Sequence, residues 1–162
     1  MIESGLHKRL QVLHGNSSLG QAELVDRVVG MNSEKKFVQV LDFDRVINRL
    51  HLEAAYASAL EAFSEGTNIS KKLYIEFLLF AGMTRQISAA TSIFKVRDTK
   101  NFVVVFDGAS LLNRIKEFAS VSELEVSRNH EDAAAKSFNI DSDRKHLNER
   151  ILQKMAVSRL VE

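Results

Sequence analysis

The chain has 162 residues, of which 45% are hydrophobic and 27% are charged, and its net charge is +1. This length supports one domain with a real core and is too short for two ordinary domains, so we expect a single domain over residues 1–162. The near-zero net charge argues against wholesale nucleic-acid or membrane binding, and the absence of cysteine excludes disulfides and thiolate metal sites.

Four short segments have the composition of β-strands. The segments 10–13 and 37–41 are apolar and partly β-branched, and Phe102–Phe106 (FVVVF) is a continuous β-branched and aromatic run. Such a run is typical of a strand buried on both faces, so we place it at the centre of the sheet. Residues 123–126 alternate polar and apolar, which predicts an edge strand.

Helical periodicity fills the intervals between these strands. We expect Gly66 to lie where one helix ends, Ser70 to cap the next, and Asp141 or Asp143 to cap the last one. The predicted helices cover 17–29, 52–63, 70–81, 85–94, 111–118, 131–138 and 144–160. The fold class is therefore α/β (α+β), a single layered domain with a small mixed sheet of about four strands flanked by helices and a helix-rich C-terminus.

The apolar run that begins at Leu73 stops at Gly82, and the polar group Arg85-Gln86-Ile87 opens the next segment. We expect two helices to meet there at a polar corner. Glycine inside a helix costs about 1 kcal/mol relative to alanine, so Gly82 is expected at a helix end, with a left-handed backbone. Residues 70–100 carry six cations and two acids, a local charge of +4. The basic residues of this corner could neutralise phosphates, and nearby aromatic rings could stack on unstacked bases. Alternatively, the rings belong to the core and the cations are solvated.

A short acidic pattern offers the main catalytic alternative. A predicted strand delivers Asp42 and Asp44 as Asp-x-Asp-x-Val, which resembles the first motif of haloacid-dehalogenase-type phosphatases, in which an aspartate attacks phosphorus beside a magnesium ion. The downstream Gly-Asp pair of that family is absent, so Asp44 is also explained as a helix cap. A small magnesium-dependent phosphatase using Asp42 and Asp44 remains the alternative function.

Other catalytic and cofactor signatures are missing from the sequence. The five histidines show no metal-binding spacing, and no Gly-rich phosphate loop occurs, so we expect no metal and no cofactor. The N-terminus lacks the apolar core of a signal peptide, and the run 73–83 is far shorter than the roughly 20 residues of a spanning helix. We therefore expect a soluble, cytoplasmic protein without a membrane partner.

The last predicted helix has more apolar surface than one core contact needs. Leu147, Ile151 and Met155 form one stripe, whereas Leu152 and Leu160 lie elsewhere on the circumference. The helix is either wedged between the sheet and a neighbouring element or exposed as a surface for another protein.

One longer motif resembles a known family. The pattern Glu76-x-Leu78-Leu79-Phe80-Ala81-Gly82-x-x-Arg85-Gln86-Ile87-x-x-Ala90, closed by Phe94, is similar to the signature of the small kinase-binding subunit of the KEOPS complex, also called the PRPK-binding protein family. The lead-in 37–63 and the closing helix 147–160 occur in the same order. Lys95 stands where relatives usually carry glycine.

This resemblance implies a non-catalytic accessory subunit. KEOPS installs threonylcarbamoyl on an adenosine beside the anticodon of tRNAs. The accessory subunit binds the complex's small atypical kinase, contacts other subunits indirectly and, in archaeal-type members, captures the CCA tail of tRNA. On that basis we predict RNA contacts from Arg85 and Gln86 first, and weaker ones from Lys71, Lys72 and Arg97. We predict kinase contacts from Ile151, Leu152 and Met155 as apolar anchors, with Arg159 at the rim.

Overall fold

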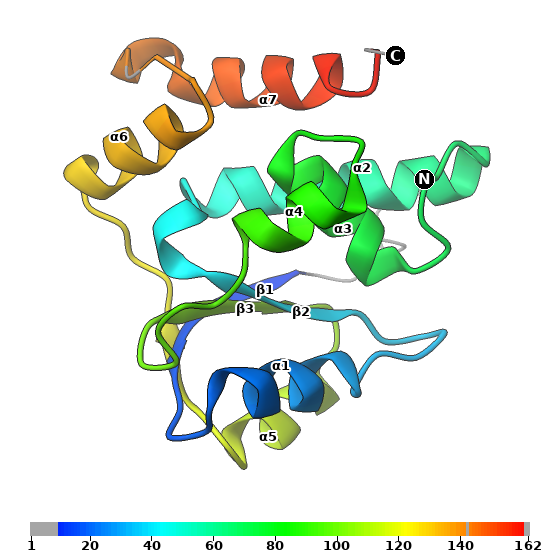
Figure 1. Cartoon of the computed structure of the whole chain (residues 1–162), viewed down its shortest axis with the longest axis vertical. Coiled ribbons are helices and arrows are strands. Elements are labelled where there is room, and N and C mark those ends of the chain that lie inside the picture. The colour runs from blue at the N-terminus through cyan, green and yellow to red at the C-terminus, as the bar shows by residue number, and fades with distance from the viewer. Residues whose placement is uncertain (1–9, 142, 161–162) are drawn as a thin grey trace.

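The computed structural model describes residues 10–141 and 143–160, in which one four-stranded sheet carries helices on both faces (Figure 1). The predicted α/β class, with helices layered on a small sheet, is confirmed. The strands are β1 (Gln11–Asn16), β2 (Val38–Asp42), β3 (Phe102–Phe106) and β4 (Ser120–Glu123). The helices are α1 (Gln21–Val29), α2 (Arg49–Glu65), α3 (Leu73–Gly82), α4 (Ile87–Ile93), α5 (Ala109–Lys116), α6 (Arg128–Ser137) and α7 (Leu147–Val157), with 3₁₀ turns η1 (Phe43–Arg45) and η2 (Arg144–His146).

The strand order is β2-β3-β1-β4, and every neighbouring pair is antiparallel. Because β1 and β2 both run antiparallel to β3, they are parallel to each other with β3 inserted between them. The unit β3-α5-β4 is split by β1 in the same way. Two interleaved β-α-β units of this kind are the arrangement of ferredoxin-like folds. The expected mixed sheet is therefore wrong in this detail. In each β-α-β unit the two parallel strands are separated by one antiparallel strand, so all neighbouring strands in the sheet are antiparallel.

The prediction for β3 is confirmed, because this strand lies inside the sheet and all five of its residues are buried. Its side chains alternate between two clusters. Val103 and Val105 belong to a larger cluster, and Phe102, Val104 and Phe106 to a smaller one on the other face. A continuous apolar run thus supplies both halves of the core.

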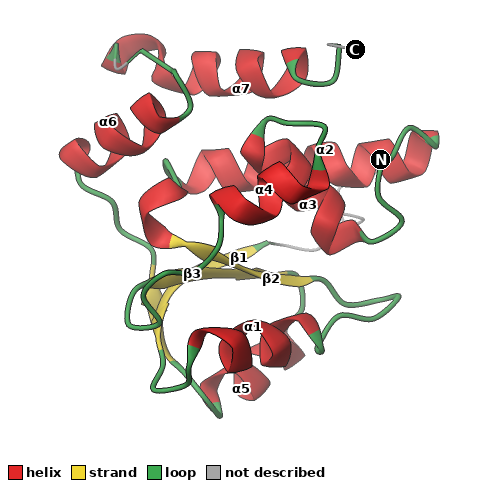
Figure 2. Cartoon of the chain, viewed as in Figure 1, coloured by secondary structure: helices red, strands yellow, loops and turns green. Residues whose placement is uncertain are grey.

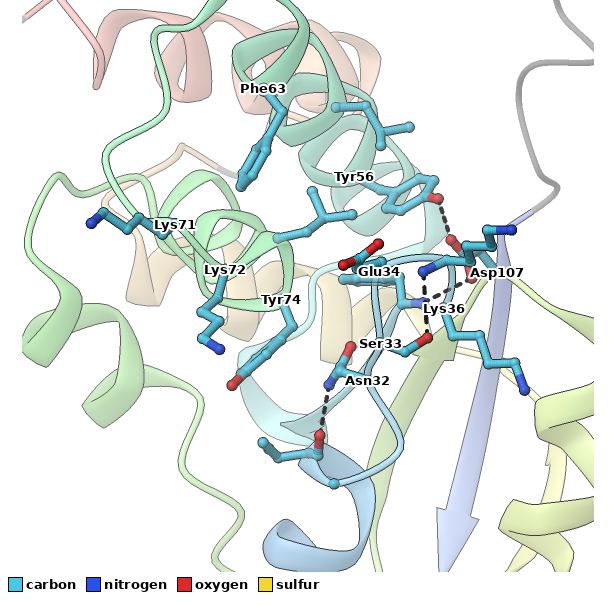
Figure 3. Close-up of a pocket in the computed structure, with 16 residues that line it drawn as sticks. Asn32, Ser33, Glu34, Lys36, Tyr56, Phe63, Lys71, Lys72, Tyr74 and Asp107 are labelled. Carbon is cyan, nitrogen blue, oxygen red and sulfur yellow. Dashed lines mark hydrogen bonds between the residues drawn. The ribbon is translucent and has the colours of Figure 1, made fainter.

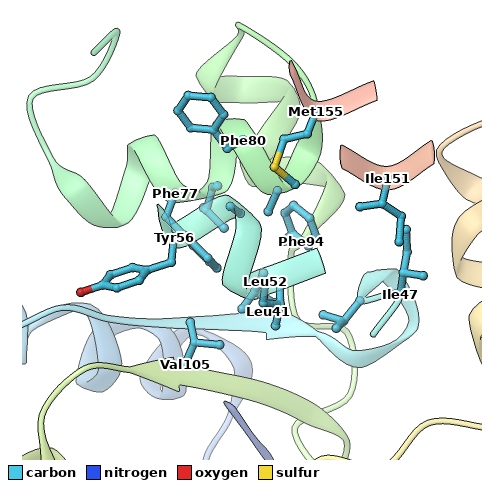
Figure 4. Packing of buried hydrophobic residues seen from close by; sticks show 14 of the residues in the cluster. Leu41, Ile47, Leu52, Tyr56, Phe77, Phe80, Phe94, Val105, Ile151 and Met155 are labelled. Carbon is cyan, nitrogen blue, oxygen red and sulfur yellow. The ribbon is translucent and has the colours of Figure 1, made fainter. Parts of the chain in front are cut away.

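The helices divide between these two faces, as the secondary-structure colouring in Figure 2 makes clear. Helices α1 and α5 contribute Leu24, Val28, Leu111 and Ile115 to the smaller cluster. Helices α2, α3 and α4 cover the opposite face, and α7 packs on α2 and α3. The larger cluster therefore extends from the sheet through the central helices to α7 (Figure 4). Each fully buried Leu or Phe side chain contributes about 1.5–3 kcal/mol to such a core.

Two helix ends near the polar corner behave differently from each other. Helix α2 ends at Gly66, which has a φ of 74°, as predicted from its glycine. Helix α3 also ends where expected, but Met83, with a φ of 55°, takes the left-handed conformation instead of Gly82. A Cβ added at Gly82 would lie 3.5 Å from the Phe94 side chain, an ordinary contact. The expectation of a left-handed Gly82 is therefore wrong.

Two predicted caps are also wrong, because neither Asp44 nor Ser70 occupies the N-cap position of the helix that follows it. Asn48 caps α2 by accepting a hydrogen bond from the His51 amide, whereas Asp44 lies within η1. Lys72 occupies the N-cap position of α3, and the Ser70 hydroxyl accepts its amide hydrogen bond at 3.1 Å. The Asp143 carboxylate accepts from the Lys145 amide at the start of η2, which confirms one of the two expected caps.

Several helices and strands begin at residues other than those predicted, because tertiary contacts override the local sequence pattern. The Ser17 hydroxyl donates to the Phe118 carbonyl, so α1 begins only at Gln21. Strand β4 lies three residues before its predicted position, since pairing with β1 ends at Glu123 and Leu124 packs against the larger cluster. Helix α4 begins at Ile87, not at residue 85.

Candidate functional site

A groove of about 730 Å³ opens between three parts of the fold (Figure 3). The segment between α1 and β2 forms one wall, the second half of α2 another, and the start of α3 the third. The lining residues come from all three walls and from the end of β3: Val29, Gly30, Asn32, Ser33, Glu34, Lys35, Lys36, Phe37, Tyr56, Leu60, Phe63, Lys71, Lys72, Leu73, Tyr74 and Asp107.

The segment that carries Lys35 and Lys36 is held in place by Asn32. The Asn32 side-chain amide donates to the Val29 and Val38 carbonyls at 3.1 and 3.0 Å, and its oxygen accepts from the Val38 amide at 2.9 Å. A short antiparallel bridge joins Ser33 to Lys36. The two lysines therefore lie on a turn that is fixed before any ligand binds.

Asp107, a buried acid that lines the groove, already has hydrogen-bond partners within the protein. Both Asp107 oxygens accept hydrogen bonds, from the Phe37 amide at 3.0 Å and from the Tyr56 hydroxyl at 2.7 Å. Burial raises the pKa of Tyr56 well above its usual range, and the adjacent Asp107 acts in the same direction. The groove opening thus carries Lys35, Lys36, Lys71 and Lys72, with Glu34 as the exposed acid among its lining residues.

The walls also present aromatic surface between the lysines. Phe63 is exposed at the edge of the groove, and Tyr74 is half-buried. The Tyr74 carbonyl accepts a hydrogen bond from the Gln39 side chain at 2.9 Å, which fixes the start of α3 against the sheet. Cationic side chains beside aromatic faces suit a ligand with phosphates and unpaired bases.

The five predicted RNA-contact residues lie in three places and not at one corner. Lys71 and Lys72 are at the groove, immediately before α3. Arg85 and Gln86 follow α3, and a helix of ten residues, about 15 Å long, separates them from the lysines. Arg97 lies beyond α4, where its amide donates to the Asp42 carboxylate at 3.4 Å.

The side chains of these five residues are exposed, and they take no part in the ion pairs formed among residues 10–141 and 143–160. Arg85 donates one hydrogen bond, from Nη1 to the Arg159 carbonyl at 3.0 Å. The charges of the four cations among them, and the Gln86 amide, therefore remain available to an anionic ligand.

The two aspartates of the phosphatase pattern, Asp42 and Asp44, differ in their exposure to solvent. Asp42 is buried at the end of β2, and burial raises the pKa of its carboxyl, whereas Asp44 is exposed. Within the described part of the chain, no group of three or more His, Asp or Glu side chains could hold a metal ion. The structure thus brings no further acidic ligand to this pair.

Helix α7 divides the predicted kinase contacts into buried and exposed residues. Ile151 is 0% exposed and Met155 is also buried, and both pack in the larger cluster (Figure 4). Their expected role as anchors for a partner is wrong in this fold, because the stripe that they share with Leu147 faces α2 and α3. Leu152, 44% exposed, does lie on the surface. Arg159 is not a rim residue, because it pairs with Glu76.

The outer face of α7 carries further apolar residues beyond Leu152. Ala156 follows it by one helical turn and Val157 lies beside Ala156, whereas Leu160 lies in the turn after α7; all three are exposed. Leu160 alone is 78% exposed. An apolar stripe of this kind at the surface is a feature of protein-binding faces.

Sequence reasoning missed the lysines of the turn between α1 and β2. The Asn-Ser-Glu-Lys-Lys run at 32–36 is visible as a polar turn. Its proximity to Lys71 and Lys72 depends on the packing of the start of α3 against β2, where Gln39 donates to the Tyr74 carbonyl, and no local pattern reveals this contact.

An α/β domain with a basic groove and an exposed apolar helix face has the features of a binding module. The family model of the kinase-binding protein CGI-121 matches residues 16–159, and the chain belongs to this family of kinase-binding proteins. None of the curated proteins compared with the chain matches it. Among the described helices, none has the length and apolar character required to cross a membrane.

Proposed function

We propose that this protein is a non-catalytic accessory subunit of the KEOPS complex in the cytoplasm. It binds the complex's small atypical kinase and the CCA tail of tRNA, and so supports threonylcarbamoyl-adenosine modification. The observation that carries the proposal is the family match, which spans the groove, the signature segment and α7.

The RNA part of the proposal rests on the groove. A single-stranded RNA end exposes phosphates and unstacked bases, and the groove offers lysines beside the rings of Phe63 and Tyr74. Lys71 and Lys72 therefore become the central contacts, replacing Arg85 and Gln86. The remaining candidates, Arg85, Gln86 and Arg97, are exposed cationic or polar positions outside the groove.

The kinase part of the proposal rests on the outer face of α7. Leu152, Ala156 and Val157, together with Leu160 just after the helix, form an apolar surface that the described part of the chain leaves exposed. Apolar anchors at the centre of an interface carry most of its binding energy, so we assign Leu152 that position.

One experiment tests both halves of the proposal. The purified chain is titrated with tRNA that ends in CCA and with the same tRNA trimmed of these three nucleotides, and separately with the kinase. The proposal requires tighter binding of the intact tRNA and a stable complex with the kinase. Equal affinity for the two tRNAs refutes the RNA half, and the absence of a kinase complex refutes the other.

A further inference from the structure

Glu76 has a buried carboxylate that contacts two segments lying far from each other in the sequence. It projects from the first turn of α3, and its side chain is 0% exposed. Oε1 accepts hydrogen bonds from the Ile69 and Ser70 amides at 3.0 and 2.8 Å. These amides immediately precede Lys71 and Lys72, so Oε1 positions one rim of the groove. Oε2 forms an ion pair with Nη2 of Arg159, which follows the end of α7.

Beyond the buried Met155, the contacts of Arg159 connect the segment that follows α7 to α3 and to Arg85. Its guanidinium lies over the Phe80 ring, 4.0 Å from the centroid, and its carbonyl accepts from Arg85. Met155 is the last buried hydrophobic residue of the described chain, and Val157 and Leu160 beyond it are exposed. Since no apolar side chain after Met155 enters the core of the described chain, the Arg159 contacts hold the turn 158–160 that follows α7.

The pair is better suited to linking two segments than to holding the fold together. Replacing a buried ion pair with apolar residues is often neutral or stabilising, whereas removing one partner leaves an uncompensated buried charge. Arg159 Nε is in addition buried without a hydrogen-bond partner among the described residues. The pair therefore makes the placement of each segment depend strongly on the other.

We propose that the Glu76–Arg159 pair couples the outer face of α7 to the groove. A protein bound over Leu152 and Leu160 keeps Arg159 on Glu76, and Glu76 then keeps Lys71 and Lys72 in the position that accepts an RNA end. The coupling rests on the proposed function, which supplies the two ligands. Because linkage is reciprocal, RNA in the groove strengthens partner binding by the same factor.

Displacement of Arg159 has a definite structural consequence. The Glu76 carboxylate then lacks its cation in a buried position, which is unfavourable unless water reaches it. The segment 69–72 lies against this carboxylate and is partly exposed, so it opens first. The lysines at the rim consequently lose their fixed placement.

The first test uses no ligand. Amide hydrogen exchange is measured for Ile69 and Ser70 in the wild-type chain and in Arg159→Met, which keeps an unbranched apolar stem but removes the charge. We expect exchange at both amides to accelerate at least tenfold. The matched control is Arg150→Met on α7, since Arg150 pairs with Asp141 and Asp143 and not with α3. Unchanged exchange at Ile69 and Ser70 in a folded Arg159→Met protein overturns the proposal.

The second test measures the coupling itself. RNA affinity is determined with and without saturating kinase for the wild type, Arg159→Met and Glu76→Gln. Glu76→Gln retains a side-chain oxygen for the Ile69 and Ser70 amides but cannot form the ion pair. We expect the kinase to raise wild-type RNA affinity about fivefold or more, and to have no effect on either variant that still binds both ligands.

The same factor in the variants and in the wild type refutes the coupling. A wild-type chain that binds neither ligand refutes the proposed function, whereas the exchange experiment judges the link between Glu76 and Arg159 by itself. Arg159→Lys, which keeps the charge but not the planar fork, restores part of the protection if Arg159→Met fails to fold.

Discussion

The Tyr56 hydroxyl donates a 2.7 Å hydrogen bond to Asp107, and this contact joins α2 to the end of β3 inside the groove. The Asp107 carboxylate also accepts from the Phe37 amide, so one acid connects β2, β3 and α2. The inner part of the groove is therefore a fixed part of the fold, and not a surface that forms when a ligand binds.

Tyr56→Phe removes this hydrogen bond and leaves the Asp107 carboxylate with one partner fewer. Hydrogen bonds to charged groups contribute about 1.5–3 kcal/mol, so we expect a loss of about 2 kcal/mol in the free energy of unfolding, measured with urea. The control is Tyr74→Phe, because the Tyr74 hydroxyl makes no hydrogen bond to the described residues. Its effect should stay within about 0.5 kcal/mol. Equal destabilisation by both changes would contradict the role of Asp107.

His51 gives the fold a dependence on mildly acidic pH. Burial lowers the pKa of His51 to about 4, while its ring accepts from the Ile47 amide and donates to the Ala81 carbonyl. The unfolded state, with a pKa near 6.5, binds a proton that the folded state refuses, so stability falls as the pH drops through 6.5 towards 4. Between pH 7 and 5 this single group should cost about 2 kcal/mol.

The His51 prediction is checked by following its imidazole resonances between pH 7 and 5, where they should show the neutral ring throughout. Urea unfolding at the two pH values provides the second measurement, with His51→Gln as the comparison. The Gln variant should lose the corresponding part of the pH dependence. A His51 midpoint near 6.5 would show that the ring is accessible to solvent.

Lys71→Ala/Lys72→Ala should weaken tRNA binding and reduce its dependence on salt. Removing one lysine–phosphate interaction with a single strand lowers the slope of log K against log salt by about 0.7, so the double variant should lower it by about 1.4. Lys95→Ala/Lys100→Ala removes the same charge from exposed positions outside the groove. Fluorescence anisotropy at several salt concentrations measures both. If the two double variants are indistinguishable, the groove is not the RNA site.

Leu152→Asp and Ile151→Asp separate partner binding from folding on one helix. Leu152 is exposed, so its aspartate variant should keep the wild-type unfolding temperature while losing the kinase in a pull-down. Ile151 is buried in the larger cluster, and its variant should unfold or lose more than about 3 kcal/mol. Gln153→Asp is the matched surface control and should retain the kinase. Retention by a folded Leu152→Asp protein would remove α7 from the interface.

The sequence predicted those features that depend on local pattern. The FVVVF run identified the central strand because both faces of β3 are covered, and Gly66 marked the end of α2 because glycine tolerates a positive φ. Features set by contacts between distant residues were not visible. Asn48 displaced Asp44 as a cap, and Glu76 fixed the turn that Ser70 was expected to cap.

The sequence predicted only part of the candidate site, because the rest depends on contacts between residues that are distant in the chain. Lys71 and Lys72 were recognised as cations, but the groove that they share with Lys35 and Lys36 exists only in the folded chain. The apolar surplus on the last helix was visible, yet a helical wheel does not reveal that Ile151 points inward and Leu152 outward. That choice follows from the packing of α7 on α2 and α3.

The interleaved strand order also determines when, during synthesis, β2 can pair with its neighbour in the sheet. Among the described strands, β2 pairs with β3 alone, and residues 43–101, which include α2, α3 and α4, must be translated before β3 appears. All five residues of β2 are buried in the finished fold, so a nascent chain exposes the apolar side chains of Val38, Val40 and Leu41 without their strand partner for the whole interval. Such delayed long-range pairing slows folding and leaves an aggregation-prone edge, so newly made chains should depend on chaperones that shield extended segments.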